Sequence, residues 1–361
     1  MTPTLPRVAR AFAAAILLAA TLVLAGPPAA AVQKSASCEV ETTARVVAVG
    51  DVHGAYDKFQ AILREAGVID NRRRWIGGKT ILVQTGDVLD RGPDSREALD
   101  LLRKLEPEAE RAGGKVYALL GNHEVMRMLN QREYISAGEF EEFKSFDAEG
   151  LRESAWEIVV KQAAEQTRKL GKEFDERAFR KLFLQDNPLG AIEMQIAFAP
   201  TGDYGKWLRE RDAMVKINGI VFLHGGISPS VAPLGCAAIN AQVRAELKLP
   251  GPPPEQEKAL TTGPDGPLWY RGLVDGNAAI GQAEIDAILK QLDARAIVVG
   301  HTQPPDFKMR ATFDGKVIQI DTGMLGGTFF PGGMPSALEI AGGTFTAIYE
   351  GRREVLVPSG R

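Results

Sequence analysis

Gly50-Asp51-Val52-His53-Gly54 is the stretch from which we interpret the fold of this 361-residue chain. It follows an apolar run, residues 45–49, and precedes an amphipathic segment, so we expect it where a buried strand ends and a helix begins. An aspartate and a histidine two residues apart can bind one cation if the backbone turns there, which the two glycines permit. Asp-x-His alone also occurs by chance, in which case His53 is an ordinary hydrogen-bonded residue.

Two further stretches repeat this arrangement of an apolar strand that leads into a polar cluster flanked by glycine. Residues 80–84 run into Gly86-Asp87-Val88-Leu89-Asp90-Arg91-Gly92, and residues 115–120 run into Gly121-Asn122-His123-Glu124. Amphipathic helical patterns follow the first two clusters. Three such units in succession indicate an α/β fold, in which sites form in the loops at the carboxyl ends of the strands.

Residues 125–215 interrupt this alternation. They are rich in Glu, Lys, Arg, Phe and Ala and predict a largely helical insertion, with two or three amphipathic helices between residues 140 and 181. The insertion either shapes the substrate site as a cap or packs on one edge of the fold, and the sequence leaves both interpretations open.

Strand and helix patterns resume after residue 215. A strand pair turns at Asn218-Gly219 and runs into His224-Gly225-Gly226, and a strand over 294–299 ends in Gly300-His301-Thr302. Further β structure is predicted for residues 316–321, 337–341 and 344–349.

The organisation that follows is one domain over residues 45–350, preceded by a short segment, 32–44, and followed by a flexible tail, 351–361. Two stretches are candidates for the rim of a site. They are the turn-rich loop that contains Tyr204, and Asp321-Thr322-Gly323.

The first 31 residues differ in character from the rest. Arg7 and Arg10 precede an apolar run over residues 11–24, and Ala29-Ala30-Ala31 offers a cleavage site after Ala31. This layout predicts a secretory signal peptide and an exported protein, periplasmic or secreted, with no stable membrane insertion after cleavage. An uncleaved membrane anchor is the alternative. The net charge of −3 and the pI near 6.0 argue against a nucleic-acid partner.

Only two cysteines are present, Cys38 and Cys236. In an exported chain they can form a disulfide that ties the new N-terminus to the middle of the domain, and two separate thiols are the alternative. Two cysteines are too few for a cysteine-based zinc site.

All four histidines lie at predicted strand ends, beside a glycine or one residue from it: His53, His123, His224 and His301. Asp51, Asp87, Asp90 and Asn122 occupy the same kind of position. Unrelated structural histidines would not all share that context. Carboxylates, imidazoles and an amide without a thiolate suit Mn, Fe or Zn.

The five ordered motifs that contain these residues resemble the calcineurin-like metallophosphoesterase superfamily. Within it they are most similar to the phosphoprotein phosphatase branch and its bacterial Shewanella-like phosphatases. The resemblance covers about residues 45–325 and implies a four-layer α/β/β/α sandwich, here with a helical insertion. It departs from the eukaryotic enzymes in the 102 residues between Asn122 and His224, where the insertion lies.

The resemblance also implies a role for each residue. Asp51 and His53 would hold one metal ion, Asp87 would bridge two, and the second would be held by Asn122, His224 and His301. His123 would protonate the leaving oxygen and Asp90 would orient it. Arg91 would bind the phosphate, together with Asn122. Arg271, in Leu268-Trp269-Tyr270-Arg271-Gly272, is the candidate second phosphate arginine, or else a surface arginine.

The implied function is hydrolysis of phosphoprotein or phosphopeptide monoesters, or of a small phosphoester, by in-line attack of a hydroxide that bridges two divalent metal ions (Mn, Fe or Zn). A phosphodiesterase or dinucleotide polyphosphate hydrolase is the alternative, because Asp90-Arg91 does not separate these branches. A non-catalytic metal-binding interaction protein is the third possibility. The presence of every metal and acid residue of the family pattern argues against it.

Overall fold

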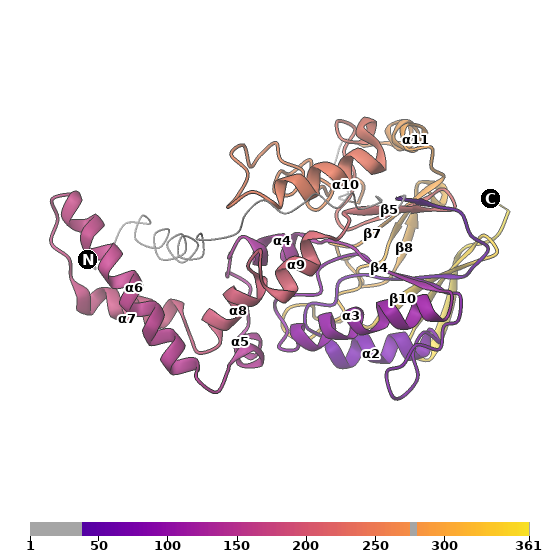
Figure 1. Ribbon diagram of the computed structural model, residues 1–361. Coiled ribbons are helices and arrows are strands. Elements are labelled where there is room, and N and C mark those ends of the chain that lie inside the picture. The colour runs from indigo at the N-terminus through magenta and orange to yellow at the C-terminus, as the bar shows by residue number, and fades with distance from the viewer. Residues whose placement is uncertain (1–37, 275–279, 361) are drawn as a thin grey trace.

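Two six-stranded sheets pack face to face in the computed structural model, which describes residues 38–274 and 280–360 (Figure 1). The predicted signal peptide, residues 1–31, lies outside the described residues. In spatial order, the first sheet, here the β2 sheet, contains β12 (Arg352–Val357), β11 (Thr344–Tyr349), β10 (Ser336–Ala341), β2 (Val46–Val49), β3 (Ile81–Gln84) and β4 (Lys115–Ala118).

Both sheets contain parallel and antiparallel strand pairs. In the second sheet, here the β6 sheet, β6, β7 and β9 are parallel at the centre. In spatial order it contains β1 (Glu39–Val40), β5 (Met214–Ile217), β6 (Ile220–Leu223), β7 (Ala296–Val299), β9 (Val317–Gln319) and β8 (Arg310–Thr312).

Helices cover the outer face of each sheet. Helices α2 (Tyr56–Glu65) and α3 (Ser95–Arg111) lie on the β2 sheet, and α10 (Gly235–Glu246) and α11 (Gln282–Gln291) lie on the β6 sheet (Figure 1). The result is the predicted four-layer α/β/β/α sandwich, and that prediction is confirmed.

Alternating side chains of the central strands bury both faces of each sheet. In β2, Val46 and Ala48 belong to the apolar cluster between the sheets, with Phe222 of the β6 sheet, whereas Val47 and Val49 pack toward the helices. Strands buried on both faces read as continuous apolar runs, which is why the sequence marked them so clearly. The polar residue that follows each run is therefore held at the edge of the sandwich.

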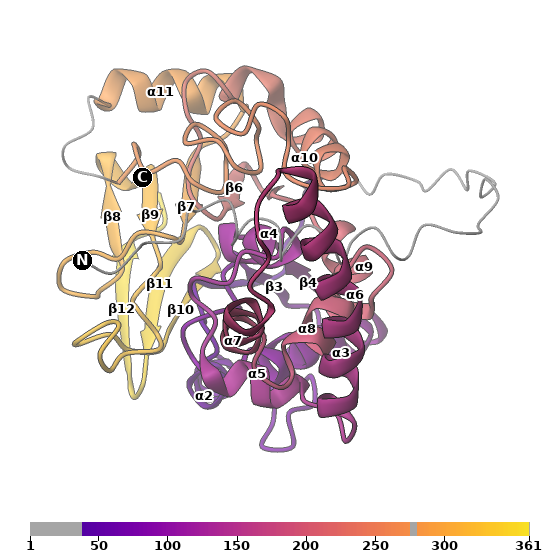
Figure 2. The same cartoon turned by 90° about the vertical axis from the view of Figure 1, so that its left-hand side faces the viewer.

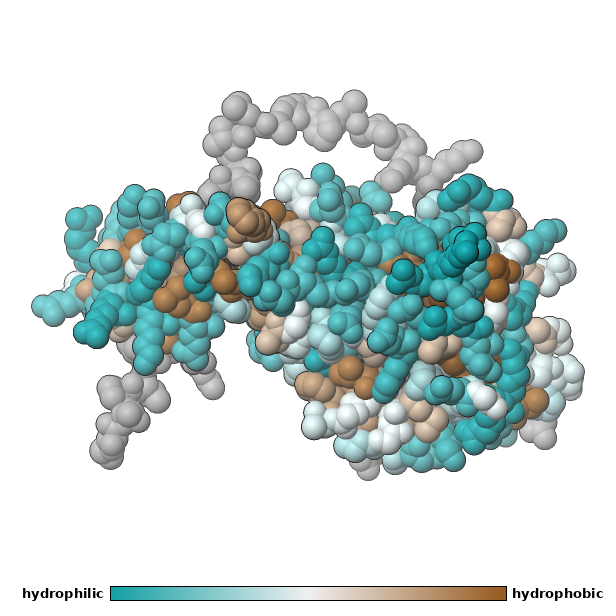
Figure 3. Space-filling view, turned by 90° about the horizontal axis from the view of Figure 1, so that it is seen from below, coloured by the Kyte–Doolittle hydropathy of each residue, from teal (hydrophilic) through white to brown (hydrophobic). Residues whose placement is uncertain are grey.

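Helices also occupy most of residues 125–215, as the sequence predicted. They are α4 (Asn122–Met128), α5 (Ala137–Phe143), α6 (Ala148–Lys169), α7 (Glu176–Asp186), α8 (Ala191–Phe198) and α9 (Asp203–Arg209). Helices α6 and α7 form a hairpin that projects from the sandwich (Figures 1 and 2). Trp156, Val159 and Phe183 form a small core of their own there, and apolar patches show on this part of the surface in Figure 3. In the described residues, no helix is both long enough and apolar enough to cross a bilayer.

Two expectations from the sequence are wrong. The tail after residue 351 was expected to be flexible, yet Arg352–Val357 is strand β12, paired antiparallel with β11 after a turn in which Gly351 has a φ of 67°. Tyr204 is not at a site rim, because it lies in α9 and is buried. Its hydroxyl donates to Asp100 at 2.8 Å and its ring stacks on Phe198.

A disulfide joins Cys38 to Cys236, so the separate-thiol alternative does not hold. The bond ties the first described residue to α10, and the following strand β1 pairs parallel with β5. The N-terminal segment is thereby fastened to the edge of the β6 sheet.

Candidate metal centre and active site

Loops from both sheets converge on one site. Asp51, Asp87 and Asn122 follow β2, β3 and β4 of the β2 sheet, and His224 and His301 follow β6 and β7 of the β6 sheet. All five residues are buried, with no more than 5% of their surface exposed. Strands β2, β3 and β4 are parallel neighbours, and so are β6 and β7, so the carboxyl ends of each group meet at one edge of the sandwich. The structure therefore brings the predicted metal ligands together.

The backbone at this site is left-handed at several residues other than glycine. The φ angle is 48° at His53, 57° at Asp87, 71° at Asp90, 70° at Arg91 and 64° at His301. Such conformations cost free energy and are retained where the surrounding structure holds them in place. Here the N–H groups of Val52 and His53 both donate to the carbonyl of Asp87, at 2.9 and 3.0 Å.

The carboxylate of Asp87 is at the centre of the cluster. Its Oδ2 atom lies 3.7 Å from His53 Nε2 and 3.2 Å from His224 Nε2. The same oxygen lies 3.8 Å from His123 Nε2. Burial would raise the pKa of Asp87, but these three imidazoles hold that pKa well below its usual range. Asp87 is thus an ionised carboxylate surrounded by His53, His123 and His224.

Hydrogen bonds to the backbone orient two of the predicted histidine ligands. His53 Nδ1 lies 2.8 Å from the carbonyl of Leu89, and His224 Nδ1 lies 3.0 Å from that of Thr85. A carbonyl only accepts, so each Nδ1 carries the proton and each Nε2 presents a lone pair toward Asp87.

The donor set fits divalent cations. His224 Nε2 and Asn122 Oδ1 are only 2.9 Å apart, although both are acceptors when His224 donates through Nδ1. His301 Nε2 is buried and has no hydrogen-bond partner among the described residues. A cation in contact with these atoms would satisfy all three, and nitrogen and oxygen ligands of this kind suit the first-row metals and zinc.

The protonation states of the buried residues at the site also favour a bound cation. Burial lowers the pKa of His53 to about 3 and that of His301 to about 2, so both imidazoles are neutral and available as ligands. Burial, together with the nearby Asp321 and Asp87 carboxylates, raises the pKa of Asp51 well above its usual range. Crowded buried carboxylates beside neutral imidazoles make a site in which positive charge is favoured.

His123 has a different environment from the other histidines. Its Nδ1 lies 2.6 Å from Asp90 Oδ2. Burial lowers the pKa of His123, but Asp87 and Asp90 more than offset this, so that its pKa is raised. Distance alone would count His123 as a ligand together with His53 and Asp87. The Asp90 partner instead favours a protonated imidazole that can donate from Nε2.

Two arginines border the site. Arg91 Nη1 contacts His53 Nε2, and its guanidinium lies between the rings of Tyr134 and Phe330, 5.5 and 5.4 Å from their centroids. Arg271 donates to the carbonyl of His301 at 2.8 Å and to a neighbouring threonine hydroxyl at 2.7 Å. Arg271 is exposed, and it lies beside His301 at the site.

Asp321 lies deeper than the rim position expected for it. It follows β9 and is fully buried, its carboxylate is hydrogen-bonded to Asp51, and its Oδ1 accepts from the N–H of Gly323 at 2.9 Å. Thr322 donates to the carbonyl of Met334 at 2.7 Å, which is a structural contact. Asp321 thus belongs to the acidic cluster itself.

The sequence assigned no role to three buried residues that support the site. Glu124 accepts from the N–H groups of Asp87 at 2.8 Å and of Gly121 at 2.8 Å, and it also holds the two residues after Asp87. Arg127 and Glu139 bond to Asp90. A weak signal was present, because Arg127 is four residues after His123 and so lies on the same face of α4.

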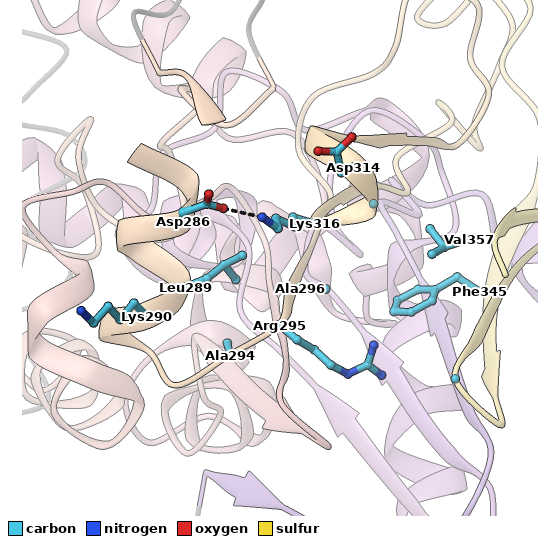
Figure 4. A pocket seen from close by; sticks show the side chains of 12 residues that line it. Asp286, Leu289, Lys290, Ala294, Arg295, Ala296, Asp314, Lys316, Phe345 and Val357 are labelled. Atoms are coloured by element: carbon cyan, nitrogen blue, oxygen red, sulfur yellow. Dashed lines mark hydrogen bonds and ion pairs between the residues drawn. The ribbon is translucent and has the colours of Figure 1, made fainter. Parts of the chain in front are cut away.

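The pocket in Figure 4, of about 460 Å³, is a different feature. It is lined by Asp286 of α11, which pairs with Lys316 at 2.5 Å, and by Ala296 and Phe345. Ala296 begins β7, whereas the site follows the end of β7. This pocket therefore opens at the opposite end of the strand from the predicted metal ligands.

A four-layer sandwich with such a site at its strand ends defines a metallophosphoesterase. Residues 44–305 match the calcineurin-like phosphoesterase family, and the chain belongs to this family of metal-using hydrolases. It is 30% identical over 310 residues to Shewanella-like protein phosphatase 2 of Arabidopsis thaliana, covering 83% of this chain and 76% of the relative. It is 27% identical over 289 residues to Shewanella-like protein phosphatase 1 of Plasmodium berghei, covering 79% and 68%.

The solved structures agree. The crystal structure of a cold-active protein-tyrosine phosphatase from a psychrophilic Shewanella species superposes with a TM-score of 0.66 at 26% identity, over 88% of this chain and 82% of that one. The resemblance inferred from the five motifs is confirmed.

Glu124→Gln tests the support of Asp87. The substitution turns an NH₂ group toward backbone N–H donors, so we expect unfolding to cost about 1–3 kcal/mol less. We also expect weaker metal binding, because Asp87 loses its anchor. Urea denaturation and metal content after dialysis measure the two effects. Glu141→Gln is the control, since the Glu141 side chain is 69% exposed. Unchanged stability and metal content in Glu124→Gln would contradict the assignment.

Proposed function

We propose that the protein is a phosphomonoesterase with two divalent metal ions that hydrolyses phosphoproteins or phosphopeptides. The observation that carries this proposal is the split of four histidines around Asp87. Three of them are held neutral or oriented as ligands, and one, His123, is paired with a carboxylate. Asp51, His53 and Asp87 would hold one ion, and Asp87, Asn122, His224 and His301 the other.

The residues divide the chemistry among them. When bound, the metal ions supply charge neutralisation and activation of water, for which Mn, Fe and Zn are all suited. Arg91 and Arg271 bind the non-bridging phosphate oxygens, for which a planar guanidinium is well shaped. His123 donates its Nε2 proton to the oxygen of the leaving group, and Asp90 holds His123 in the required tautomer through Nδ1.

Aromatic side chains favour an aromatic ester as the substrate. Tyr134 packs edge-on against His123, with centroids 5.1 Å apart, and Phe330 stacks on His53 at 5.8 Å. A phosphate on Arg91 would place its ester group beside these rings, where a phenyl ring gains contact. The Shewanella enzyme, described as a protein-tyrosine phosphatase, supports the same preference.

The activity is tested with purified protein stripped of metal and reloaded with Mn, Fe or Zn. We expect release of inorganic phosphate from phosphotyrosine and phosphoserine peptides, faster from phosphotyrosine because of the flanking rings. Dinucleotide polyphosphates and phosphodiesters are assayed in parallel. Turnover of these substrates alone would favour the alternative hydrolase, and failure to cleave any phosphomonoester with the three metals would refute the proposal.

His123→Ala separates the acid from the ligands. We expect a loss of about 10²–10⁴-fold in kcat, the usual contribution of a general acid, with two metal ions still bound per chain. His224→Ala is the matched variant and should lose metal, because His224 is assigned as a ligand. Elemental analysis beside steady-state kinetics measures both. A fall to one metal ion in His123→Ala would show that His123 is a ligand.

We further propose that the protein is exported and that its signal peptide is removed. The support is the charged, apolar and small-residue order of residues 1–31, together with two cysteines that form a disulfide, a bond typical of oxidising compartments. Mass spectrometry of protein from the cell envelope should find an N-terminus at or near Val32. Recovery of intact Met1 in the membrane fraction would indicate an anchor instead.

A further inference from the structure

A buried ionic network joins the helical insertion to Asp90. Arg127 of α4 donates from Nη2 to Asp90 Oδ1 and, at 3.0 Å, to Glu139 Oε1. The same Glu139 oxygen accepts from the backbone N–H of Asp90 at 3.2 Å. These contacts close a ring in which Glu139 and Arg127 hold both the backbone and one carboxylate oxygen of Asp90. The other oxygen, Oδ2, is left for His123.

Glu139 brings the insertion into this ring. It lies in α5, is 0% exposed, and is oriented by a capping box in which Glu139 Oε2 accepts from the N–H of Ser136 at 3.2 Å. A second helix of the insertion, α8, encloses Arg127. Met194 Sδ lies 3.1 Å from Arg127 Nη1, and the Phe198 ring centroid lies 5.2 Å from the guanidinium carbon.

The burial of its charges argues against a purely stabilising role for this network. Arg127 is 4% exposed, and its Nε atom has no hydrogen-bond partner among the described residues. Burying an arginine and two carboxylates costs desolvation energy that such ion pairs often fail to recover, and apolar residues of similar size frequently stabilise more. What the ring does supply is a fixed direction for the Asp90 carboxylate, since both of its oxygens and its N–H are committed.

We propose that Arg127 and Glu139 are positioning residues for proton transfer, through which α5 and α8 of the insertion hold the Asp90–His123 pair in its working geometry. This inference rests on the proposed function, in which His123 protonates the leaving oxygen. Among the described residues, no hydrogen bond or ion pair joins either side chain to a proposed metal ligand or to Arg91 or Arg271, whereas both side chains bond to Asp90. The insertion is then part of the catalytic apparatus even though its α6–α7 hairpin projects away from the sandwich.

The test compares two aryl phosphates on the metal-loaded enzyme. Phenyl phosphate has a basic leaving group that needs a proton, whereas 4-nitrophenolate leaves without one. In Glu139→Gln and Arg127→Met we expect kcat for phenyl phosphate to fall by about 10–100-fold, the usual effect of removing a partner that orients a functional residue. We expect kcat for 4-nitrophenyl phosphate, KM and the two bound metal ions to change little. Glu139→Gln retains side-chain volume and hydrogen-bonding atoms, which guards against a variant that fails to fold.

Two matched controls isolate the effect. Glu141→Gln changes another glutamate of α5, whose carboxylate pairs with Lys144 at the surface. Arg132→Met removes another arginine of the same region, which donates to the carbonyl of Asp186 at 2.9 Å and to Gln195 at 3.1 Å, away from Asp90. Neither should alter the ratio of the two rates.

The outcomes are distinct. Equal losses on both substrates in Glu139→Gln, or loss of metal, would overturn the positioning role and leave Arg127 and Glu139 as structural residues. A wild-type enzyme that cleaves neither the aryl phosphates nor a phosphopeptide would instead overturn the proposed function.

Discussion

The site depends on one constraint, the fixed position of the Asp87 carboxylate between histidines that come from both sheets. Glu124 holds the backbone of Asp87, and the carbonyl of Asp87 in turn holds Val52 and His53. The first two strand-end loops are therefore fastened to each other and to the start of α4. Because His224 arrives from the opposite sheet, 3.2 Å from the same carboxylate, the packing of the two sheets sets the geometry of the site.

Local hydrogen bonds give the four histidines different environments, although the residue type is the same. His53 donates to a backbone carbonyl, which is neutral, and burial then lowers its pKa. His123 faces the carboxylate of Asp90, and its pKa is raised. Two imidazoles whose ring centroids are 4.9 Å apart therefore have opposite protonation tendencies. The proposed roles of metal ligand and proton donor require this difference between neighbouring imidazoles.

Much of this arrangement was predictable, because strands buried on both faces leave long apolar runs whose ends are easy to locate. Asp51, Asp87 and His301 could be placed together from that pattern and from the family motifs. Glu139 could not be, because its contact with Asp90, 49 residues away in sequence, depends on how α5 packs against α3 and α8. Strand β12 was missed because its exposed side chains hide the alternation, and Tyr204 because a turn-rich sequence proved to begin a helix.

The helical insertion contacts the site at two residues of the loop after β3, Asp90 and Arg91. The proposed ligands lie one to four residues beyond the strands, whereas Asp90 lies six residues beyond the end of β3, in a left-handed conformation with a φ of 71°. Such a loop needs support from outside the sandwich. Helices α5 and α8 provide it through Glu139 and the enclosure of Arg127. Since Tyr134 from the same region also accepts the N–H of Arg91 through its carbonyl at 2.8 Å, the insertion supports both the proposed acid and the proposed phosphate arginine.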